Sequence, residues 1–158
     1  MHEKVTERRV KILLVEDEAI IAMQEEQMLR NAGYEVVKAY SGEKAISMVD
    51  ESSQDGPIDL ILMDIDLGDG LNGVEAARRI LELREVPVVF LTSHTEQDYV
   101  ELAKQVSSYG YVVKNSGEFV LLRSIEVAFE LFHAHQRERQ QTRHYEQLLH
   151  TSEEGILS

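Results

Sequence analysis

The chain has 158 residues and a formal net charge of −13 at pH 7, which fits one acidic globular domain with an appendage. This acidity disfavours nucleic acid as a partner, because DNA-binding proteins contact phosphates with clustered Lys and Arg. The lack of cysteine excludes disulfides and thiolate metal sites. No apolar run approaches the ~18 residues of a membrane span, and the polar first residues do not resemble a secretory signal, so we expect a cytoplasmic protein without membrane contact.

Short apolar runs alternate with amphipathic segments along most of the chain. The segments that we expect to be strands are 10–15, 34–39, 58–63, 87–91 and 109–113. The segments that we expect to be helices are 18–31, 41–50, 74–83, 95–106 and a fifth helix that opens at 115–118. Gly33 is the expected C-terminal cap of the first helix, Ser41 is a suitable N-cap for the second, and Asn115 with Glu118 has the capping-box pattern for the fifth.

Five repeats of strand and helix predict a parallel sheet that is covered by helices on both faces. The nearly uninterrupted apolar character of the strands agrees, because strands of such a sheet are buried on both sides. Right-handed crossovers leave few topologies. We therefore predict an α/β fold, a flavodoxin-like (βα)5 three-layer sandwich with strand order 2-1-3-4-5 and an extended C-terminal helix.

Polar residues stand at the ends of four predicted strands, where sheets of this class bind their ligands. Glu16 and Asp17 follow the first strand, Asp64 the third, Thr92 the fourth and Lys114 the fifth. In the predicted order these side chains line one rim. Carboxylates this close repel one another unless a cation lies among them, and hard oxygen ligands favour Mg²⁺.

A carboxylate beside Mg²⁺ can act as a nucleophile and form an aspartyl phosphate. Phosphoryl transfer mainly requires positioning and charge neutralisation. The ammonium of Lys114 and the hydroxyl of Thr92 are suited to the phosphoryl oxygens that the metal does not contact. The set predicts phosphoryl transfer onto Asp64.

The motifs that carry these residues resemble the receiver domain of two-component response regulators. They are Ile12-Leu-Leu-Val-Glu-Asp-Glu18, Leu60-Ile-Leu-Met-Asp-Ile-Asp-Leu67, Gly70-Leu-Asn-Gly73, Val88-Val-Phe-Leu-Thr-Ser93 and Gly110-Tyr-Val-Val-Lys114. The resemblance implies that Asp64 is the phosphoacceptor. It also implies that Mg²⁺ is bound directly by Asp17 and Asp64, through water by Glu16, and by the backbone carbonyl of Asp66.

The resemblance implies a switch as well as a site. Lys114 would pair with the phosphoryl group, Thr92 would move to hydrogen-bond it, and Tyr111 would follow Thr92 as an aromatic rotamer switch. The face of the fourth helix, fifth strand and fifth helix would then change. The phosphodonor would be a histidine kinase or a histidine phosphotransfer protein, and the chain would catalyse only its own phosphorylation and dephosphorylation.

The sequence departs from the family pattern after the lysine, where Asn115 replaces the usual proline of a cis peptide. Because a non-proline cis bond costs ~3 kcal/mol, we expect either a trans bond with a reshaped loop or a strained cis bond. We also hypothesise that Asp66 and His94, each two residues beyond a site residue, tune dephosphorylation; plain surface roles are the alternative.

The C-terminal part predicts a connector. We expect an N-terminal tail at 1–9, a receiver domain at 10–132, a helical linker at 133–151 and the start of a PAS-like domain at 152–158. The parent would then be a hybrid sensor histidine kinase, although this chain contains no kinase motif. The linker is expected to pair with a second copy, together with the face of the fourth helix, fifth strand and fifth helix; a frayed polar terminus is the alternative.

Three other functions are alternatives to a phosphoacceptor. In a haloacid-dehalogenase-type phosphatase, Asp64 would be the nucleophile and Asp66 the acid, but that family places its acidic metal pair after the lysine. A flavodoxin needs a phosphate loop after the first strand, where the acidic residues would repel phosphate. A degenerate receiver that acts only as a scaffold would not need all five site residues.

Overall fold

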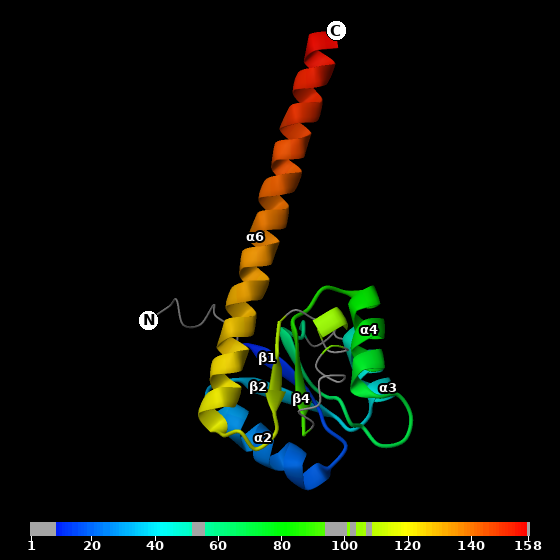
Figure 1. Cartoon of the computed structure of the whole chain (residues 1–158), viewed down its shortest axis with the longest axis vertical. Coiled ribbons are helices and arrows are strands. Elements are labelled where there is room, and N and C mark those ends of the chain that lie inside the picture. Colours follow the sequence, from blue (N-terminus) through cyan, green and yellow to red (C-terminus); the bar gives the residue numbers. More distant parts are fainter. Residues whose placement is uncertain (1–8, 52–55, 94–100, 102–103, 107–108, 158) are drawn as a thin grey trace.

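The computed structural model describes residues 9–51, 56–93, 101, 104–106 and 109–157, and a parallel five-stranded sheet forms its centre (Figure 1). The strands are β1 (Lys11–Val15), β2 (Glu35–Ala39), β3 (Leu60–Asp64), β4 (Val88–Thr92) and β5 (Tyr111–Val113). Their spatial order is β2-β1-β3-β4-β5, and every neighbouring pair is parallel. This confirms the predicted flavodoxin-like topology.

Helices cover both faces of the sheet. They are α2 (Ala19–Asn31), α3 (Gly42–Asp50), α4 (Gly73–Leu83) and α6 (Glu118–Leu157). On one face, Leu29 of α2 and Ile125 of α6 pack with Leu62 of β3. On the other face, apolar residues of α3 and α4 pack with Ile61 and Phe90. Because successive strand residues point to opposite faces, the apolar runs supply both cores. The helix predicted at 95–106 lies largely outside the described residues.

Local capping explains where the helices near the site begin and end. The Ser41 hydroxyl accepts a hydrogen bond from the Lys44 amide at 3.1 Å, and the Asn72 side chain accepts one from the Glu75 amide at 2.9 Å. Each bond satisfies one of the free amides of a first helical turn. Gly33, just beyond α2, has φ 101°, a left-handed conformation that favours glycine.

The predicted capping box at the start of the last helix is wrong. The Lys114–Asn115 peptide bond is trans, and Asn115 has φ 65°. The Ser116 amide donates to the Val113 carbonyl at 3.3 Å, which closes a tight turn, and the Leu121 amide donates to the Gly117 carbonyl at 3.2 Å. The turn uses Asn115 at its left-handed position, which asparagine tolerates better than most residues, so helix α6 begins at Glu118. Of the two alternatives that we expected, the trans bond with a reshaped loop is the one observed.

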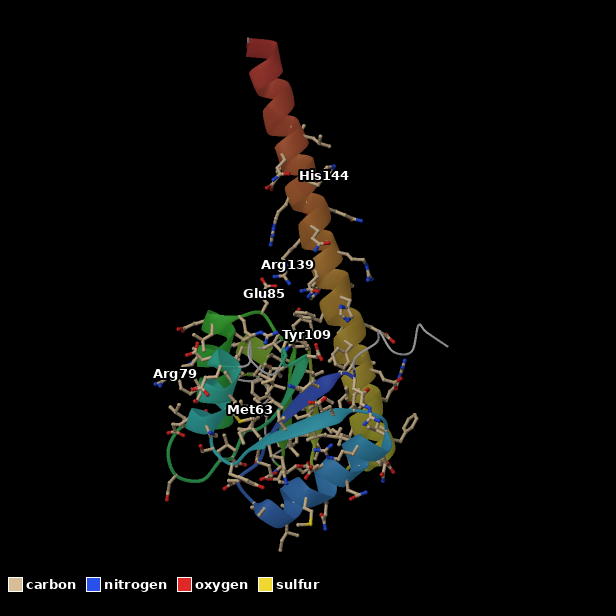
Figure 2. All side chains as sticks on the ribbon, turned by 180° about the vertical axis from the view of Figure 1, so that it is seen from behind. Met63, Arg79, Glu85, Tyr109, Arg139 and His144 are labelled. Atoms are coloured by element: carbon tan, nitrogen blue, oxygen red, sulfur yellow. The ribbon has the colours of Figure 1, made fainter. Side chains whose placement is uncertain are left out.

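Helix α6 continues far beyond the sheet, as the predicted extended helix does (Figure 1). It remains in contact with the domain after residue 132. The Tyr109 hydroxyl lies 3.1 Å from His135 Nδ1, and the Tyr109 ring packs edge-on against Phe132. Arg139 donates to Glu85 at 2.6 Å, and Figure 2 shows these two side chains beside each other. Among the described residues, no helix is both long and apolar enough to cross a membrane.

Candidate functional site

The polar residues predicted at the strand ends do lie at one edge of the sheet. Glu16 and Asp17 directly follow β1, and Lys114 directly follows β5. Asp64 and Thr92 are the last residues of β3 and β4. In a parallel sheet all of these ends share one side, and the order β1-β3-β4-β5 places them next to one another. The topology therefore assembles groups that are up to 98 positions apart in the chain.

Lys114 joins the two buried carboxylates of this edge. Its ammonium Nζ lies 2.8 Å from Glu16 Oε1 and 2.8 Å from Asp64 Oδ2. Glu16 and Asp64 are 0% and 1% exposed, so the three charges interact with little screening by solvent. Buried charges are stable only when they are paired and hydrogen-bonded, and this arrangement satisfies both conditions.

Backbone amides hold the remaining carboxylate oxygens. The Asp66 amide donates to Asp64 Oδ1 at 3.0 Å, and the Glu18 amide donates to Glu16 Oε2 at 3.2 Å. Each donor stands two residues after its acceptor, so the chain turn that follows each strand supplies it. Both carboxylates are thereby oriented before any ligand binds.

The pKa shifts of the carboxylates at this edge reflect an excess of negative charge. Burial raises the pKa of Asp64 to about 7, with a further rise from neighbouring Glu16, while Lys114 acts in the opposite direction. Burial also acts to raise the pKa of Glu16, but hydrogen bonds from Lys114 and the backbone bring it below its usual value. The pKa of Asp17 is raised by burial and by its contact with Glu16. One lysine therefore does not neutralise three carboxylates.

The donor set fits a divalent cation. Carboxylate oxygens of Glu16, Asp17 and Glu18 lie within 4.8 Å of one another. A Cβ on Gly68 would lie 3.0 Å from Asp17 Oδ2, so the loop after β3 reaches the carboxylate that follows β1. Hard oxygen donors with room for water are typical of Mg²⁺ sites. Glu18 was not among the predicted ligands.

A glycine brings that loop close to the site. A Cβ on Gly73 would lie 2.0 Å from the carbonyl oxygen of Asp64, which is far inside van der Waals contact. The first residue of α4 therefore packs directly on the end of β3, and only glycine allows that approach.

The other predicted residues are placed unequally. Thr92 is 1% exposed and Tyr111 is 41% exposed. Thr92 pairs with Val113, two residues after Tyr111, so Thr92 and Tyr111 point to the same face of the sheet. Asp66 is exposed, whereas its backbone amide donates to Asp64. His94 lies outside the described residues.

The model of the response regulator receiver domain family matches residues 12–126. The chain belongs to this family. It is 34% identical to the transcriptional regulatory protein PdtaR of Mycobacterium tuberculosis, over 77% of this chain and 58% of that protein. It is 36% identical to the phyllosphere-induced regulator PhyR of Methylorubrum extorquens, over 60% of this chain and 35% of that one. The receiver domain thus spans less than two thirds of these relatives.

Solved structures agree with this assignment. The N-terminal domain of a response regulator/sensory box/GGDEF three-domain protein from Carboxydothermus hydrogenoformans is 44% identical, with a TM-score of 0.71 over 79% of this chain and 98% of that one. The receiver domain of a modulated diguanylate cyclase from Desulfovibrio desulfuricans is 30% identical, with a TM-score of 0.71 over 81% of this chain and 99% of that one. The family match does not favour the haloacid-dehalogenase alternative.

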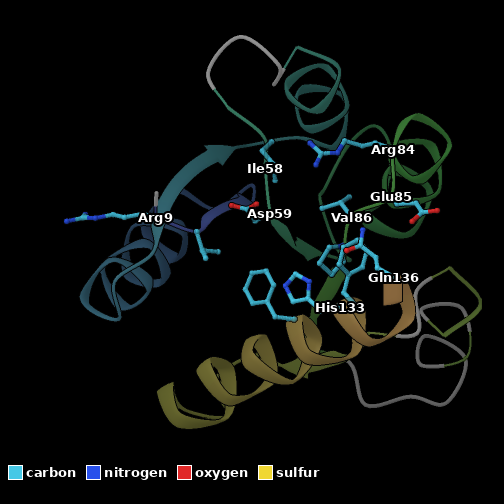
Figure 3. A pocket seen from close by; sticks show the side chains of 12 residues that line it. Arg9, Ile58, Asp59, Arg84, Glu85, Val86, His133 and Gln136 are labelled. Carbon is cyan, nitrogen blue, oxygen red and sulfur yellow. The ribbon is translucent and has the colours of Figure 1, made fainter. Parts of the chain in front are cut away.

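The described residues also form a hollow away from this site. A cavity of about 590 Å³ lies at the opposite edge of the sheet, where Val10, Asp59 and Pro87 precede their strands and Phe132 and His133 of α6 form the wall (Figure 3). The chemistry-bearing carboxylates stand at the other end of the strands.

One ionisable group close to the site was missed by the sequence analysis. In the part of the chain that the structure describes, Glu25 Oε1 is buried without a hydrogen-bond partner. Burial raises the pKa of Glu25 to about 7, with a smaller contribution from Glu16. In sequence the residue stands in a polar run, but it follows Ala22 by three positions and precedes Leu29 by four, which places it on the buried stripe of α2.

We expect Lys114→Met to destabilise the metal-free protein by about 3 kcal/mol, because it leaves two buried carboxylates facing each other. Adding Asp64→Asn to this variant is expected to restore part of the loss, since it removes one of the two charges. Urea unfolding in EDTA measures both effects. Lys104→Met removes an exposed lysine and is expected to stay within about 0.5 kcal/mol; an equal loss in both lysine variants would contradict the bridging role.

Glu25 is expected to make stability depend on pH. Because its folded-state pKa is about 7 against 4.5, folding retains its proton, and that contribution is lost as pH rises from 4.5 through 7. Glu25→Gln should therefore gain roughly 2 kcal/mol over the wild type between pH 5 and pH 8, measured by urea unfolding. Glu82→Gln, on exposed α4 surface, serves as the charge-matched control. A Glu25→Gln difference that is constant with pH would refute the assignment.

Proposed function

We propose that this receiver domain accepts a phosphoryl group from a phosphohistidine donor onto Asp64. The observation that carries the proposal is the position of Lys114, whose ammonium lies 2.8 Å from an oxygen of Asp64. A carboxylate oxygen of Asp64 would bond to phosphorus as the phosphorus–nitrogen bond to the donor imidazole breaks. Lys114 favours the charged form of Asp64 against the effect of burial, and only that form is a nucleophile.

Four groups of this chain are proposed to hold Mg²⁺: the carboxylates of Glu16, Asp17 and Asp64 and the backbone carbonyl of Asp66, with Glu16 acting through water. When bound, the ion neutralises charge on the phosphoryl oxygens. The uncompensated carboxylates of this edge support the proposal. The buried environment strengthens each of these interactions, because charges there are poorly screened.

Lys114 and Thr92 are proposed to contact the bound phosphoryl group. The Lys114 side chain is already directed at Asp64, so it would also lie close to a phosphoryl group attached to that carboxylate. Thr92 ends the strand next to β3, so a small shift brings its hydroxyl toward Asp64. Side chains of Asp66 and His94 are proposed to tune hydrolysis of the product.

The switch is proposed to run from Thr92 to Tyr111. Both residues lie on one face of the sheet, and Tyr111 is partly exposed before phosphorylation. Movement of Thr92 toward the phosphoryl group would leave room for the Tyr111 ring to turn inward. The result would be a population shift of the face formed by 95–106, β5 and α6.

The wider context is also a proposal. The donor would be a histidine kinase or a histidine phosphotransfer protein in the cytoplasm, where ATP supplies its phosphoryl group. The similar protein of C. hydrogenoformans carries its response regulator domain before a sensory box, which supports an N-terminal receiver, a linker at 133–151 and a PAS-like module from 152.

We also propose that the chain pairs with a second copy through α6 and through the face formed by 95–106, β5 and α6. Analytical sedimentation of the phosphorylated and unphosphorylated chain measures this pairing.

We expect acetyl phosphate with Mg²⁺ to add one phosphoryl group to the wild type and none to Asp64→Asn, as measured by intact mass. Asp69→Asn, in the exposed loop after the same strand, is the matched control and should be labelled normally. Labelling without Mg²⁺, or turnover of a phosphate monoester, would favour another function. Slower or faster decay of the label in Asp66→Asn and His94→Ala checks the tuning roles, which an unchanged lifetime would remove.

The switch can be observed with a single tryptophan, because the chain contains none. In Tyr111→Trp, beryllofluoride with Mg²⁺ is expected to shift the emission to shorter wavelength as the ring leaves solvent. The same probe combined with Thr92→Ala should show a much smaller shift, since this variant lacks the hydroxyl that would hydrogen-bond the phosphoryl analogue. An unchanged spectrum in a protein that binds beryllofluoride would contradict this pathway while leaving phosphorylation intact.

A further inference from the structure

A second, smaller cavity lies behind the phosphorylation site, on the α2 and α6 side of the sheet. Its volume is about 280 Å³. The walls come from α2, from the ends of β4 and β5, from the turn after Val113 and from the first turn of α6. Lys114 belongs both to this cavity and to the phosphorylation site. The cavity and the proposed phosphorylation site are therefore adjacent and share the Lys114 side chain.

The cavity contains an unsatisfied acceptor. Glu25 lines it, and Glu25 Oε1 is buried without a hydrogen-bond partner among the described residues. A buried polar atom left without a partner costs about 1–3 kcal/mol, and such atoms are rare enough to need a cause. Lys114 lines the same cavity, but its ammonium is bonded at 2.8 Å to Glu16 and to Asp64 and makes no hydrogen bond to Glu25 Oε1.

The remaining walls are mainly apolar. Ile21 and Met28 stand one turn before and after Glu25 on α2, and Leu91, Val112 and Leu121 face them from the sheet and α6. A hollow of this size is below the range of about 300–1,000 Å³ that is usual for drug-sized ligands. The cavity suits a short aliphatic chain. The carboxyl group of Glu25 favours a chain that carries a positive charge at its end.

We propose that this cavity binds the ammonium end of a short aliphatic chain, with the ammonium paired to Glu25 and the methylene groups against the apolar walls. An ammonium group supplies the donor that Glu25 Oε1 lacks, and charge-assisted hydrogen bonds are the stronger kind. Anions are disfavoured by the same carboxyl group and by the acidity of the whole chain. The raised pKa of Glu25 agrees with a site whose counter-charge is missing.

This chemistry has two sources, a free alkylamine and a lysine side chain of another protein. Asn115 and Ser116 line the cavity and are exposed to solvent, so a side chain could enter along this turn. A free amine needs no such backbone approach. Ordered water at Glu25 is the remaining way to satisfy the oxygen, and it would bring no selectivity for cations.

The test is an NMR titration of the ¹⁵N-labelled chain with n-butylammonium, with n-butanol as the neutral probe of similar shape. We expect saturable amide shifts at the lining residues with n-butylammonium, and at least tenfold weaker binding of n-butanol. Capped lysine, N-acetyl-lysine N-methylamide, is the second arm. Binding of both cations identifies a side-chain pocket, whereas binding of n-butylammonium alone identifies a site for a free amine.

Two variants decide whether Glu25 is the partner. Glu25→Gln is expected to weaken n-butylammonium at least tenfold, while Glu82→Gln, which removes one exposed acidic charge elsewhere, should bind as the wild type does. If the Gln variant does not fold, Leu121→Phe fills the cavity and should abolish the shifts. Equal binding to wild type and Glu25→Gln, shifts confined to the acidic rim around Asp17, or equal binding of n-butanol would overturn the proposal.

Discussion

The pairing of one buried ammonium with two buried carboxylates is the interaction on which the site depends. Lys114 lies 2.8 Å from both Glu16 and Asp64, and neither carboxylate is exposed by more than 1%. Removing such charges from water is costly, and close pairing with hydrogen bonds offsets that cost. Hydrogen bonds from Lys114 and from two backbone amides hold the oxygens of both carboxylates, so their orientation is fixed before any ligand binds.

The fold explains why these charges collect at one edge. Strands buried on both faces must be apolar along their length, so polar side chains can stand only where a strand ends. The order β2-β1-β3-β4-β5 makes the ends of β1, β3, β4 and β5 neighbours. Gly73 then lets α4 begin directly against the backbone of Asp64. This contact keeps the loop between β3 and α4 near the carboxylates.

Strand β5 connects this edge to the long helix. Lys114 stands after its end, and Tyr109, just before its beginning, contacts His135 and Phe132 of α6. The strand itself has only three residues, so Lys114 and the contacts of Tyr109 with the helix are close together in the chain. The ion pair of Arg139 with Glu85 lies on exposed surface, where such pairs are worth about 0–1 kcal/mol.

The local sequence pattern was enough to predict the strands, the topology and the residues at the strand ends. Strands that are buried on both faces are continuous apolar runs, and turn residues mark where they end. The edge at which these polar residues gather followed from that topology alone. Tertiary structure decided the rest. The bridge between Lys114 and Glu16 joins residues 98 positions apart, and the turn at Asn115 replaced the predicted cap. Glu25 lines a cavity, where its Oε1 is buried without a hydrogen-bond partner among the described residues. Sequence periodicity tells which side of an element is buried, whereas the partners of a buried charge depend on elements that meet only when the chain is folded.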